Sequence, residues 1–176
     1  MNKAHFPDNP KCLWLLGLSG AGKTTLGTHV LAYLKSKYAE VLLLDGDQLR
    51  LGLNVDLGFS IKDRSENVRR TAEVAQLFLN EGYWVIVALI TPFEHMRLSN
   101  RKILGEAYVE IFINTPLEVC IQRDPKGFYS RVARKEIQHF TGIDSPFEIP
   151  QQAQLVLPTT SSIEECVLKI IRFIEE

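Results

Sequence analysis

Residues 17–25 read GLSGAGKTT and match the phosphate-binding pattern G-x-x-x-x-G-K-[ST]. Glycines in such a loop let successive backbone N–H groups point at a polyphosphate. Lys23 adds a positive charge for the outer phosphates, and the Thr24 hydroxyl is a ligand for Mg²⁺. The stretch therefore indicates binding of a nucleoside triphosphate with magnesium. The residues expected to contact the triphosphate are Gly17, Ser19, Gly20, Ala21, Gly22, Lys23, Thr24 and Thr25.

Two carboxylates, Asp45 and Asp47, stand at the end of the apolar run VLLLD. Phosphoryl transfer needs positioning, a metal, charge neutralisation and a group that orients the nucleophile. A carboxylate beside the metal can hold a metal-bound water or accept the proton of an attacking hydroxyl. An aspartate after a strand is also typical of a turn or a helix cap. Two aspartates in three residues, in a chain with a phosphate loop, favour the chemical role.

Arg64 and Asn67 lie three residues apart at the start of a predicted helix, so they share one face, and Arg50 precedes them. Arginine binds phosphate or sulfate oxygens with paired N–H groups, although a solvated surface would explain the same spacing. Phe59 precedes the helix cap. It could stack on a base or pack against the helix start, and the sequence leaves both roles open.

A basic stretch runs from Arg123 to Pro150 and is interrupted by glycine and proline. We interpret it as a lid rather than a second domain. Its cationic side chains could close over a triphosphate or could form an exposed basic loop. The cations in question are Arg123, Lys126, Arg131 and Arg134.

Apolar runs that alternate with helical patterns must position these side chains. The runs predict five strands at 12–17, 41–45, 84–90, 108–114 and 154–157. Helical periodicity predicts helices after the glycine loop and over 60–80, 93–104 and 162 onward. Ser60 followed by Asp63 resembles a capping box at the start of the 60–80 helix, which has an apolar stripe of Val68, Ala72, Ala75 and Leu79. The last helix is expected to have Ile163, Val167, Ile170 and Ile174 facing inward. Continuously apolar strands between helices indicate a parallel sheet with helices on both faces. Ligands bind at the carboxyl ends of such strands, where the polar residues of this chain fall.

The 176 residues fit one α/β domain, 11–176, after a loose lead-in over 1–10. A net charge of −1 does not favour nucleic-acid binding, so an anion site must be local. No apolar run is long enough to cross a membrane. Three widely spaced cysteines, Cys12, Cys120 and Cys166, indicate buried free thiols in a reducing compartment, which predicts a cytoplasmic protein.

The phosphate loop alone is shared by many nucleotide-binding proteins, and three longer motifs identify a family more specifically. They are DGD-x-x-R at 45–50, DLGFS-x-x-DR-x-EN-x-R-R at 56–70 and RDPKGFY at 123–129. With these motifs the chain resembles the adenylylsulfate kinases from Leu13 to about Leu157. That family transfers the γ-phosphoryl group of ATP to the ribose 3′-hydroxyl of adenylyl sulfate. The resemblance implies a three-layer P-loop NTPase fold, ATP and Mg²⁺, and a homodimer.

The resemblance also implies a role for each matching position. Asp47 would orient or deprotonate the 3′-hydroxyl, and Thr24 and Asp45 would support the magnesium. Lys23 and Lys126 would act on the transferring phosphoryl group, with Arg123 against the ATP base. The positions implied to hold the acceptor are Asp45, Arg50, Phe59, Arg64, Asn67, Ile90, Thr91 and Phe140. Phe59 and Phe140 would sandwich its adenine.

Three places depart from the family pattern: Leu51, Thr91 where serine is usual, and the stretch 94–96. They lie on the acceptor side and leave open a related P-loop kinase with another nucleotide-like acceptor. A module that senses nucleotide without phosphoryl transfer is a further alternative, which the intact Asp47 disfavours.

Overall fold

A five-stranded parallel sheet forms the centre of the computed structural model, which describes residues 10–37, 40–158 and 161–175. The strands are β1 (Cys12–Leu16), β2 (Val41–Asp45), β3 (Trp84–Ala88), β4 (Tyr108–Asn114) and β5 (Leu155–Pro158). They lie in the order β2-β3-β1-β4-β5, and every pair is parallel. The three inner strands are almost wholly buried, whereas the edge strands β2 and β5 are partly exposed.

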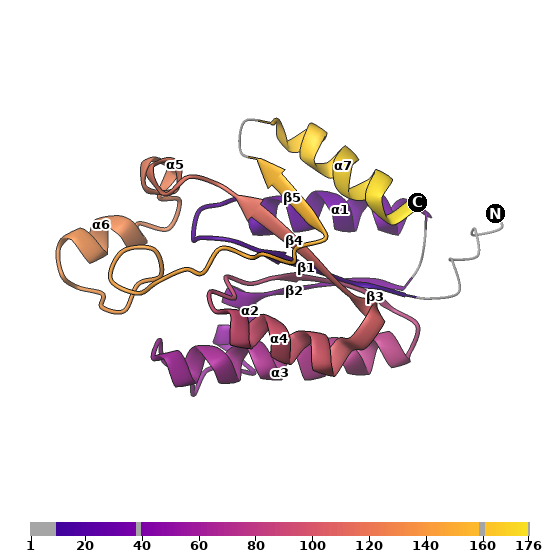
Figure 1. Ribbon diagram of the computed structural model, residues 1–176, viewed down its shortest axis with the longest axis horizontal. Helices are drawn as coiled ribbons and strands as arrows, with labels where there is room; N and C mark the ends of the chain where they lie inside the picture. The colour runs from indigo at the N-terminus through magenta and orange to yellow at the C-terminus, as the bar shows by residue number, and fades with distance from the viewer. Residues whose placement is uncertain (1–9, 38–39, 159–160, 176) are drawn as a thin grey trace.

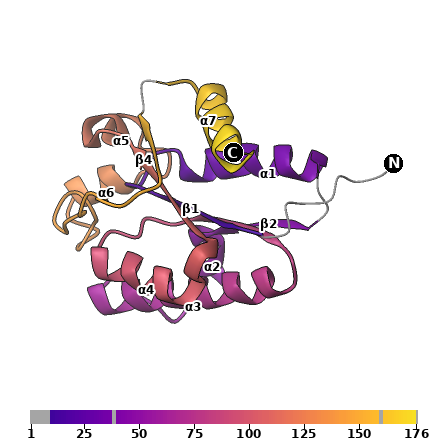
Figure 2. The same ribbon diagram turned by 45° about the vertical axis from the view of Figure 1, so that its right-hand side comes forward.

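Helices cover both faces of this sheet. On one face lie α1 (Lys23–Lys37) and α7 (Ile163–Glu175), and on the other lie α3 (Ile61–Asn80) and α4 (Glu94–Leu104) (Figures 1 and 2). The shorter elements are α2 (Gly46–Leu51), the 3-10 turn η1 (Gly105–Ala107), α5 (Leu117–Arg123) and α6 (Phe128–Ala133). The predicted α/β fold with a five-stranded parallel sheet is confirmed. Among the described helices, none combines the length and apolar character that a membrane span requires.

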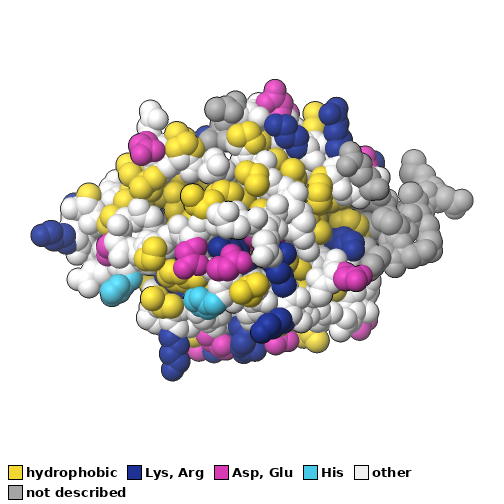
Figure 3. All heavy atoms as spheres, viewed as in Figure 1, with side chains coloured by type: hydrophobic (Ala, Val, Ile, Leu, Met, Phe, Trp, Pro, Cys, Tyr) yellow, Lys and Arg dark blue, Asp and Glu magenta, His cyan; other side chains and the backbone are white. Residues whose placement is uncertain are grey.

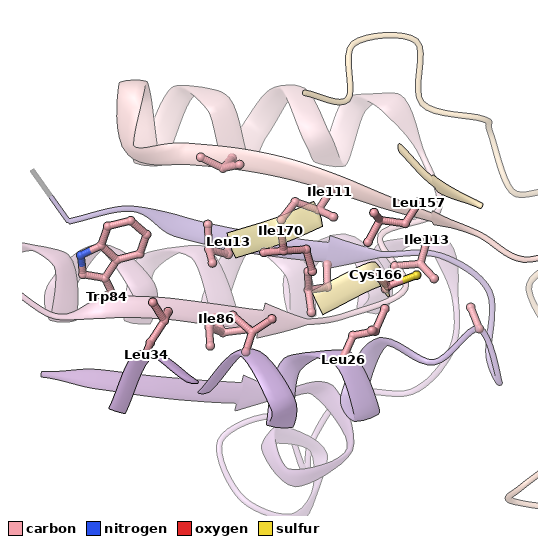
Figure 4. Packing of buried hydrophobic residues seen from close by; sticks show 14 of the residues in the cluster. Leu13, Leu26, Leu34, Trp84, Ile86, Ile111, Ile113, Leu157, Cys166 and Ile170 are labelled. Carbon is pink, nitrogen blue, oxygen red and sulfur yellow. The ribbon is translucent and has the colours of Figure 1, made fainter. Parts of the chain in front are cut away.

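The sheet separates two hydrophobic cores. Along β1, Leu13 belongs to the core with α1 and α7, and Trp14 belongs to the core with α3 and α4. Successive strand residues point to opposite faces, so a strand covered on both faces must be apolar throughout. Figure 4 shows part of the first core, including Leu13, Leu26, Leu34, Ile86, Cys166 and Ile170.

Helix α3 begins and packs as its sequence predicts. The Ser60 hydroxyl accepts a hydrogen bond from the Asp63 backbone N–H (3.1 Å) and donates one to the Asp63 carboxylate (2.7 Å). This reciprocal pairing satisfies a donor at the helix start and fixes where α3 begins. The predicted apolar stripe, Val68, Ala72, Ala75 and Leu79, is buried. The three cysteines are buried free thiols, also as predicted.

One strand boundary and one packing prediction differ from the sequence expectations. The third strand ends at Ala88 rather than at residue 90, because the chain leaves the extended conformation and Thr91 has a φ of 47°. Over 48–59, where the sequence shows no clean period, the structure has the end of the short helix α2 followed by turns. On α7, Ile170 is buried, but the prediction that Ile163 faces inward is wrong. Its side chain is 42% exposed and lines the cleft described below.

The segment 123–150 lies beyond the carboxyl ends of the strands and contains α6 (Figures 1 and 2). Two buried aromatic side chains, Tyr129 and Phe140, attach it to the core with α1 and α7, and their rings meet edge to face at 5.0 Å. Its action as a lid stays a prediction. The predicted loose lead-in falls almost wholly on residues 1–9, outside the described part of the chain.

Candidate active site

A cleft of about 1560 Å³ opens at the carboxyl ends of the strands. It is lined by the phosphate loop, the Asp45–Leu51 segment, the start of α3, the turn after β3 and part of the 123–150 segment. All the predicted site residues line it except Gly17, and so does Arg131. Two further residues that line the cleft, Ser161 and Ser162 after β5, were not predicted. The rule that ligands bind at the carboxyl ends of strands could have identified them.

The phosphate loop is shaped by close backbone packing. A Cβ at Gly17 would lie 2.7 Å from the Ile113 carbonyl oxygen, so this glycine permits the close approach of β1 to β4. Gly22 has a φ of +105°, which side chains rarely adopt, and α1 begins directly after it. The loop therefore ends at a helix N-terminus, where backbone N–H groups and the helix dipole favour an anion.

Lys23 is held within the loop. Its half-buried ammonium group donates hydrogen bonds to the carbonyl oxygens of Gly17 (3.1 Å) and Leu18 (2.7 Å). Burial, and to a smaller extent the neighbouring Lys126, lower the pKa of Lys23 to about 8 against the opposing effects of Cys120, Asp47 and Asp45. A bound polyphosphate would place negative charge beside this ammonium group and would stabilise its protonated form.

Asp45 joins the phosphate loop to α2. One carboxylate oxygen accepts the Thr24 hydroxyl (2.7 Å), and the other accepts the Asp47 backbone N–H (2.8 Å) and caps α2. The capping and chemical roles of Asp45 are thus compatible. Within the described residues no group of three or more histidine, cysteine, aspartate or glutamate side chains forms a metal cage. Mg²⁺ typically uses one or two protein oxygens with phosphate and water, so the Thr24–Asp45 pair suits that ion.

Asp47 faces the 123–150 segment. Its exposed carboxylate forms an ion pair with the ammonium group of Lys126. The turn that carries Lys126 is fixed by Asp124, whose carboxylate accepts the backbone N–H groups of Tyr129 (3.1 Å) and Ser130 (3.0 Å) at the start of α6. The two candidate catalytic groups therefore lie in contact although 79 residues separate them.

The other cations of this segment differ in position. Arg123 and Arg131 line the cleft, whereas Arg134 does not and instead pairs with Glu136 (2.6 Å). On the face in Figure 3, Lys and Arg side chains are mixed with Asp and Glu side chains. The positive charge available for a triphosphate therefore comes from individual side chains in the cleft, such as Arg123 and Arg131, and not from a positively charged face.

Phe59 occupies the acceptor side of the cleft. Its side chain is 54% exposed, with the guanidinium carbon of Arg50 4.5 Å and that of Arg64 5.8 Å from the ring centroid. Packing against the helix start would need an apolar partner at position 64, which is an arginine. The ring is therefore available at the cleft surface, in contact with cations. Arg50 is held by hydrogen bonds to the carbonyl oxygens of Leu57 (3.0 Å) and Gly58 (3.1 Å).

Arg64 is buried, with 7% of the residue exposed, and it connects α3 to the 123–150 segment. Its guanidinium donates to the Phe59 carbonyl (2.8 Å), to the Thr141 hydroxyl and to the His139 carbonyl. The last two bonds connect α3 to the residues on both sides of Phe140, through the His139 backbone and the Thr141 side chain. Burial and the neighbouring Arg50 lower the pKa of Arg64. Its implied contact with an acceptor stays a prediction, beside this positioning role.

The remaining acceptor-side residues also lie in the cleft wall. Asn67 is buried and accepts a hydrogen bond from the Asn54 amide (2.8 Å). The carbonyl oxygen of Ile90 accepts the Gly17 N–H (3.4 Å) at the start of the phosphate loop. Thr91 is buried, and its hydroxyl accepts the indole N–H of Trp14 (2.8 Å).

Replacing Arg64 with glutamine is expected to loosen residues 139–145. Hydrogen bonds from a charged donor contribute about 1.5–3 kcal/mol each, so amide exchange in this segment should rise about tenfold or more. Hydrogen exchange followed by mass spectrometry measures this change. Arg69→Gln is the matched control, because Arg69 lies on the same helix and pairs at the surface with Glu66. Equal exchange in both variants would refute the positioning role of Arg64.

Comparison with known proteins places this geometry in a family. Residues 9–158 match the family model described as adenylylsulphate kinase. The chain is 52% identical over 147 residues to the adenylyl-sulfate kinase of Paraburkholderia xenovorans, covering 84% of this chain and 82% of that protein. It is 45% identical over 163 residues to that of Clostridium kluyveri, covering 92% and 82%.

A solved structure agrees in fold as well as in sequence. The APS kinase of Mycobacterium tuberculosis, in complex with AMPPNP and APS, superposes with a TM-score of 0.93 at 43% identity. The match covers 97% of this chain and 100% of that chain. The resemblance drawn from the motifs is confirmed, and the chain belongs to the adenylylsulphate kinase family.

Proposed function

We propose that this protein transfers the γ-phosphoryl group of ATP to the ribose 3′-hydroxyl of adenylyl sulfate, which gives 3′-phosphoadenylyl sulfate and ADP. The observation that carries the proposal is one cleft that joins a phosphate loop, the Asp47–Lys126 pair and an arginine-flanked aromatic ring. A kinase for this acceptor needs all three. The M. tuberculosis relative, solved with an ATP analogue and APS, supports both substrates.

The donor end of the cleft would hold ATP. Backbone N–H groups of the loop and Lys23 would bind the β- and γ-phosphates, and Arg123, which lines the cleft, would lie against the base. Magnesium, when bound with ATP, neutralises charge on the phosphate oxygens, and Thr24 and Asp45 are the residues that would hold it. The short Thr24–Asp45 hydrogen bond already brings these two oxygen ligands together.

Asp47 would orient the 3′-hydroxyl and accept its proton. The acceptor oxygen then forms a bond to the γ-phosphorus, and the bond from that phosphorus to the β–γ bridging oxygen breaks, so that ADP leaves. Lys126 neutralises the Asp47 carboxylate in the present geometry. With both substrates bound, its ammonium would neutralise charge on the transferring group.

The acceptor end would hold adenylyl sulfate. Arg50, Arg64 and Asn67 supply donors for sulfate and phosphate oxygens. Phe59 and Phe140 offer ring surfaces for the adenine, and both line the cleft. The buried turn at Ile90 and Thr91 forms the wall between this end and the phosphate loop.

A homodimer in the cytoplasm completes the proposal. Family membership supports the dimer, and so do the strongly exposed apolar side chains of Leu51, Val55 and Ile61. Buried free thiols and the use of ATP support a reducing, cytoplasmic setting. Sedimentation equilibrium tests the dimer, and a single monomeric species at micromolar concentration would refute it.

A series of acceptors tests the reaction itself. ADP release is measured with adenylyl sulfate, adenosine 5′-phosphate, other nucleoside monophosphates and no acceptor. We expect adenylyl sulfate to give the highest kcat/KM. The departures at Leu51, Thr91 and the 94–96 stretch motivate the second candidate, a kinase for another nucleotide-like acceptor. Higher turnover with another compound would favour that candidate, and nucleotide binding without any phosphorylated product would favour a sensing module.

A further inference from the structure

Thr91 has an unusual backbone conformation for its residue type. Its φ of 47° lies in the left-handed region, which β-branched residues strongly disfavour. Strained residues of this kind persist only where their surroundings hold them, and they concentrate at functional sites. Thr91 is only 1% exposed, so it is held by neighbouring protein groups.

Two buried side chains donate hydrogen bonds to Thr91, one to its hydroxyl and one to its carbonyl. The indole N–H of Trp14, from β1, donates to the Thr91 hydroxyl at 2.8 Å. A guanidinium N–H of Arg97, from α4, donates to the Thr91 carbonyl at 3.3 Å. Trp14 is fully buried, and Arg97 is 1% exposed with its charge paired to Glu94 (2.6 Å). The hydrogen bond from Trp14 is the shorter of the two.

The turn at residues 89–92 contacts three parts of the site: the start of the phosphate loop, the start of α2 and the end of the 123–150 segment. The Ile90 carbonyl accepts the N–H of Gly17, where the phosphate loop begins. Leu89 packs against Gly46, the first residue of α2, so closely that a Cβ there would lie 2.4 Å from Leu89. The Pro92 carbonyl accepts the N–H of Glu148 (2.8 Å), at the far end of the 123–150 segment.

We propose that Trp14 is a positioning residue for phosphoryl transfer. Its indole N–H, acting through the Thr91 hydroxyl, holds the 89–92 turn in the conformation that sets the phosphate loop against α2 and therefore against Asp47. The contribution to turnover rests on the proposed kinase activity, whereas the hold on the turn does not. Filling of the core by the indole ring is the competing explanation, and it requires the ring but not its N–H.

Single substitutions separate the two explanations. Trp14→Phe keeps an aromatic ring but removes the N–H, and Thr91→Val keeps the shape but removes the hydroxyl. Each should lower kcat about tenfold, because a displaced catalytic group loses rate, while KM for ATP changes less than about twofold. Thr91→Ser, which restores a hydroxyl, should recover most of the turnover lost in Thr91→Val.

The double variant and a matched control complete the test. Trp14→Phe combined with Thr91→Val should be no slower than either single variant, because both remove the same hydrogen bond. Trp84→Phe is the control, since Trp84 is also buried in the sheet but lies at the start of β3, at the opposite end of that strand from the 89–92 turn. It should lower the melting temperature without lowering kcat. Wild-type kcat in Trp14→Phe, or additive losses in the double variant, would overturn the proposal.

Hydrogen exchange gives a readout independent of turnover. Trp14→Phe and Thr91→Val should raise exchange at the amides of Gly17 and Leu89, and Trp84→Phe should not. If the wild-type protein does not turn over adenylyl sulfate, the proposed function is wrong. The amide exchange of these variants then tests by itself whether Trp14 holds the turn. Equal exchange in Trp14→Phe and Trp84→Phe would overturn that role.

Discussion

Replacing Asp47 with asparagine is expected to lower kcat about 10²- to 10⁴-fold and to change ATP affinity less than about twofold. Asparagine keeps the shape of the side chain but cannot accept the hydroxyl proton, and it removes the negative partner of Lys126. Because Asp47 is outside the phosphate loop, donor binding should persist. Steady-state turnover and titration with a non-hydrolysable ATP analogue measure the two effects separately.

Asp56→Asn is the matched control for this prediction. Asp56 is an exposed aspartate that pairs with Arg70 (2.7 Å) and does not line the cleft. Exposed ion pairs contribute about 0–1 kcal/mol to stability, so turnover should be near that of the wild-type protein. Turnover in Asp47→Asn as high as in the control would remove Asp47 from the chemical step.

Replacing Lys23 with methionine is expected to weaken ATP affinity about 10- to 100-fold, because a charge-assisted hydrogen bond contributes about 1.5–3 kcal/mol. Turnover should fall as well, since the same ammonium stabilises the transferring phosphoryl group. Wild-type affinity should also weaken as pH rises above about 8, because less than half of free Lys23 then keeps its proton. Calorimetric titration with ATP across the pH range measures both effects.

The sign of this pH effect follows from the lowered pKa. Free Lys23 has a pKa of about 8 in place of the usual 10.5 because burial disfavours its charge. Bound phosphates favour the charged form, so binding above pH 8 takes up a proton and weakens with each further rise in pH. Lys23→Met should lack this dependence. Lys35→Met, an exposed lysine on the same helix, should keep both the wild-type affinity and the dependence. A Lys23→Met variant that matched Lys35→Met would contradict a phosphate site at this loop.

Features encoded by neighbouring residues could be predicted from the sequence. The apolar runs located all five strands, because the buried strands β1 and β3 are wholly apolar and β2, β4 and β5 are also apolar at most of their positions. The pairing of Ser60 with Asp63 located the start of α3, since a helix cap involves residues three apart. The carboxyl-end rule then placed Lys23 and Asp47 at one edge of the sheet.

Features that depend on distant segments could not be predicted in this way. The acceptor contact of Arg64 stays a prediction, whereas its hydrogen bonds to residues 139 and 141, which cross 75 and 77 positions of the chain, were not foreseen. The same is true of Thr91, whose hydroxyl is bound by Trp14 from another strand. The prediction that Ile163 faces inward was wrong for a related reason. A helical stripe shows which side of α7 is apolar, but not that its first turn extends to the cleft.

Identification of the phosphorylated product tests the proposed function most directly. The protein is incubated with ATP, magnesium and adenylyl sulfate, and the product is analysed by ³¹P nuclear magnetic resonance and mass spectrometry. We expect one new phosphomonoester on the ribose 3′-oxygen, with the sulfate retained and one ADP formed for each product, and almost none with Asp47→Asn. A phosphate at any other position, or ADP formed without a phosphorylated adenylyl sulfate, would contradict it.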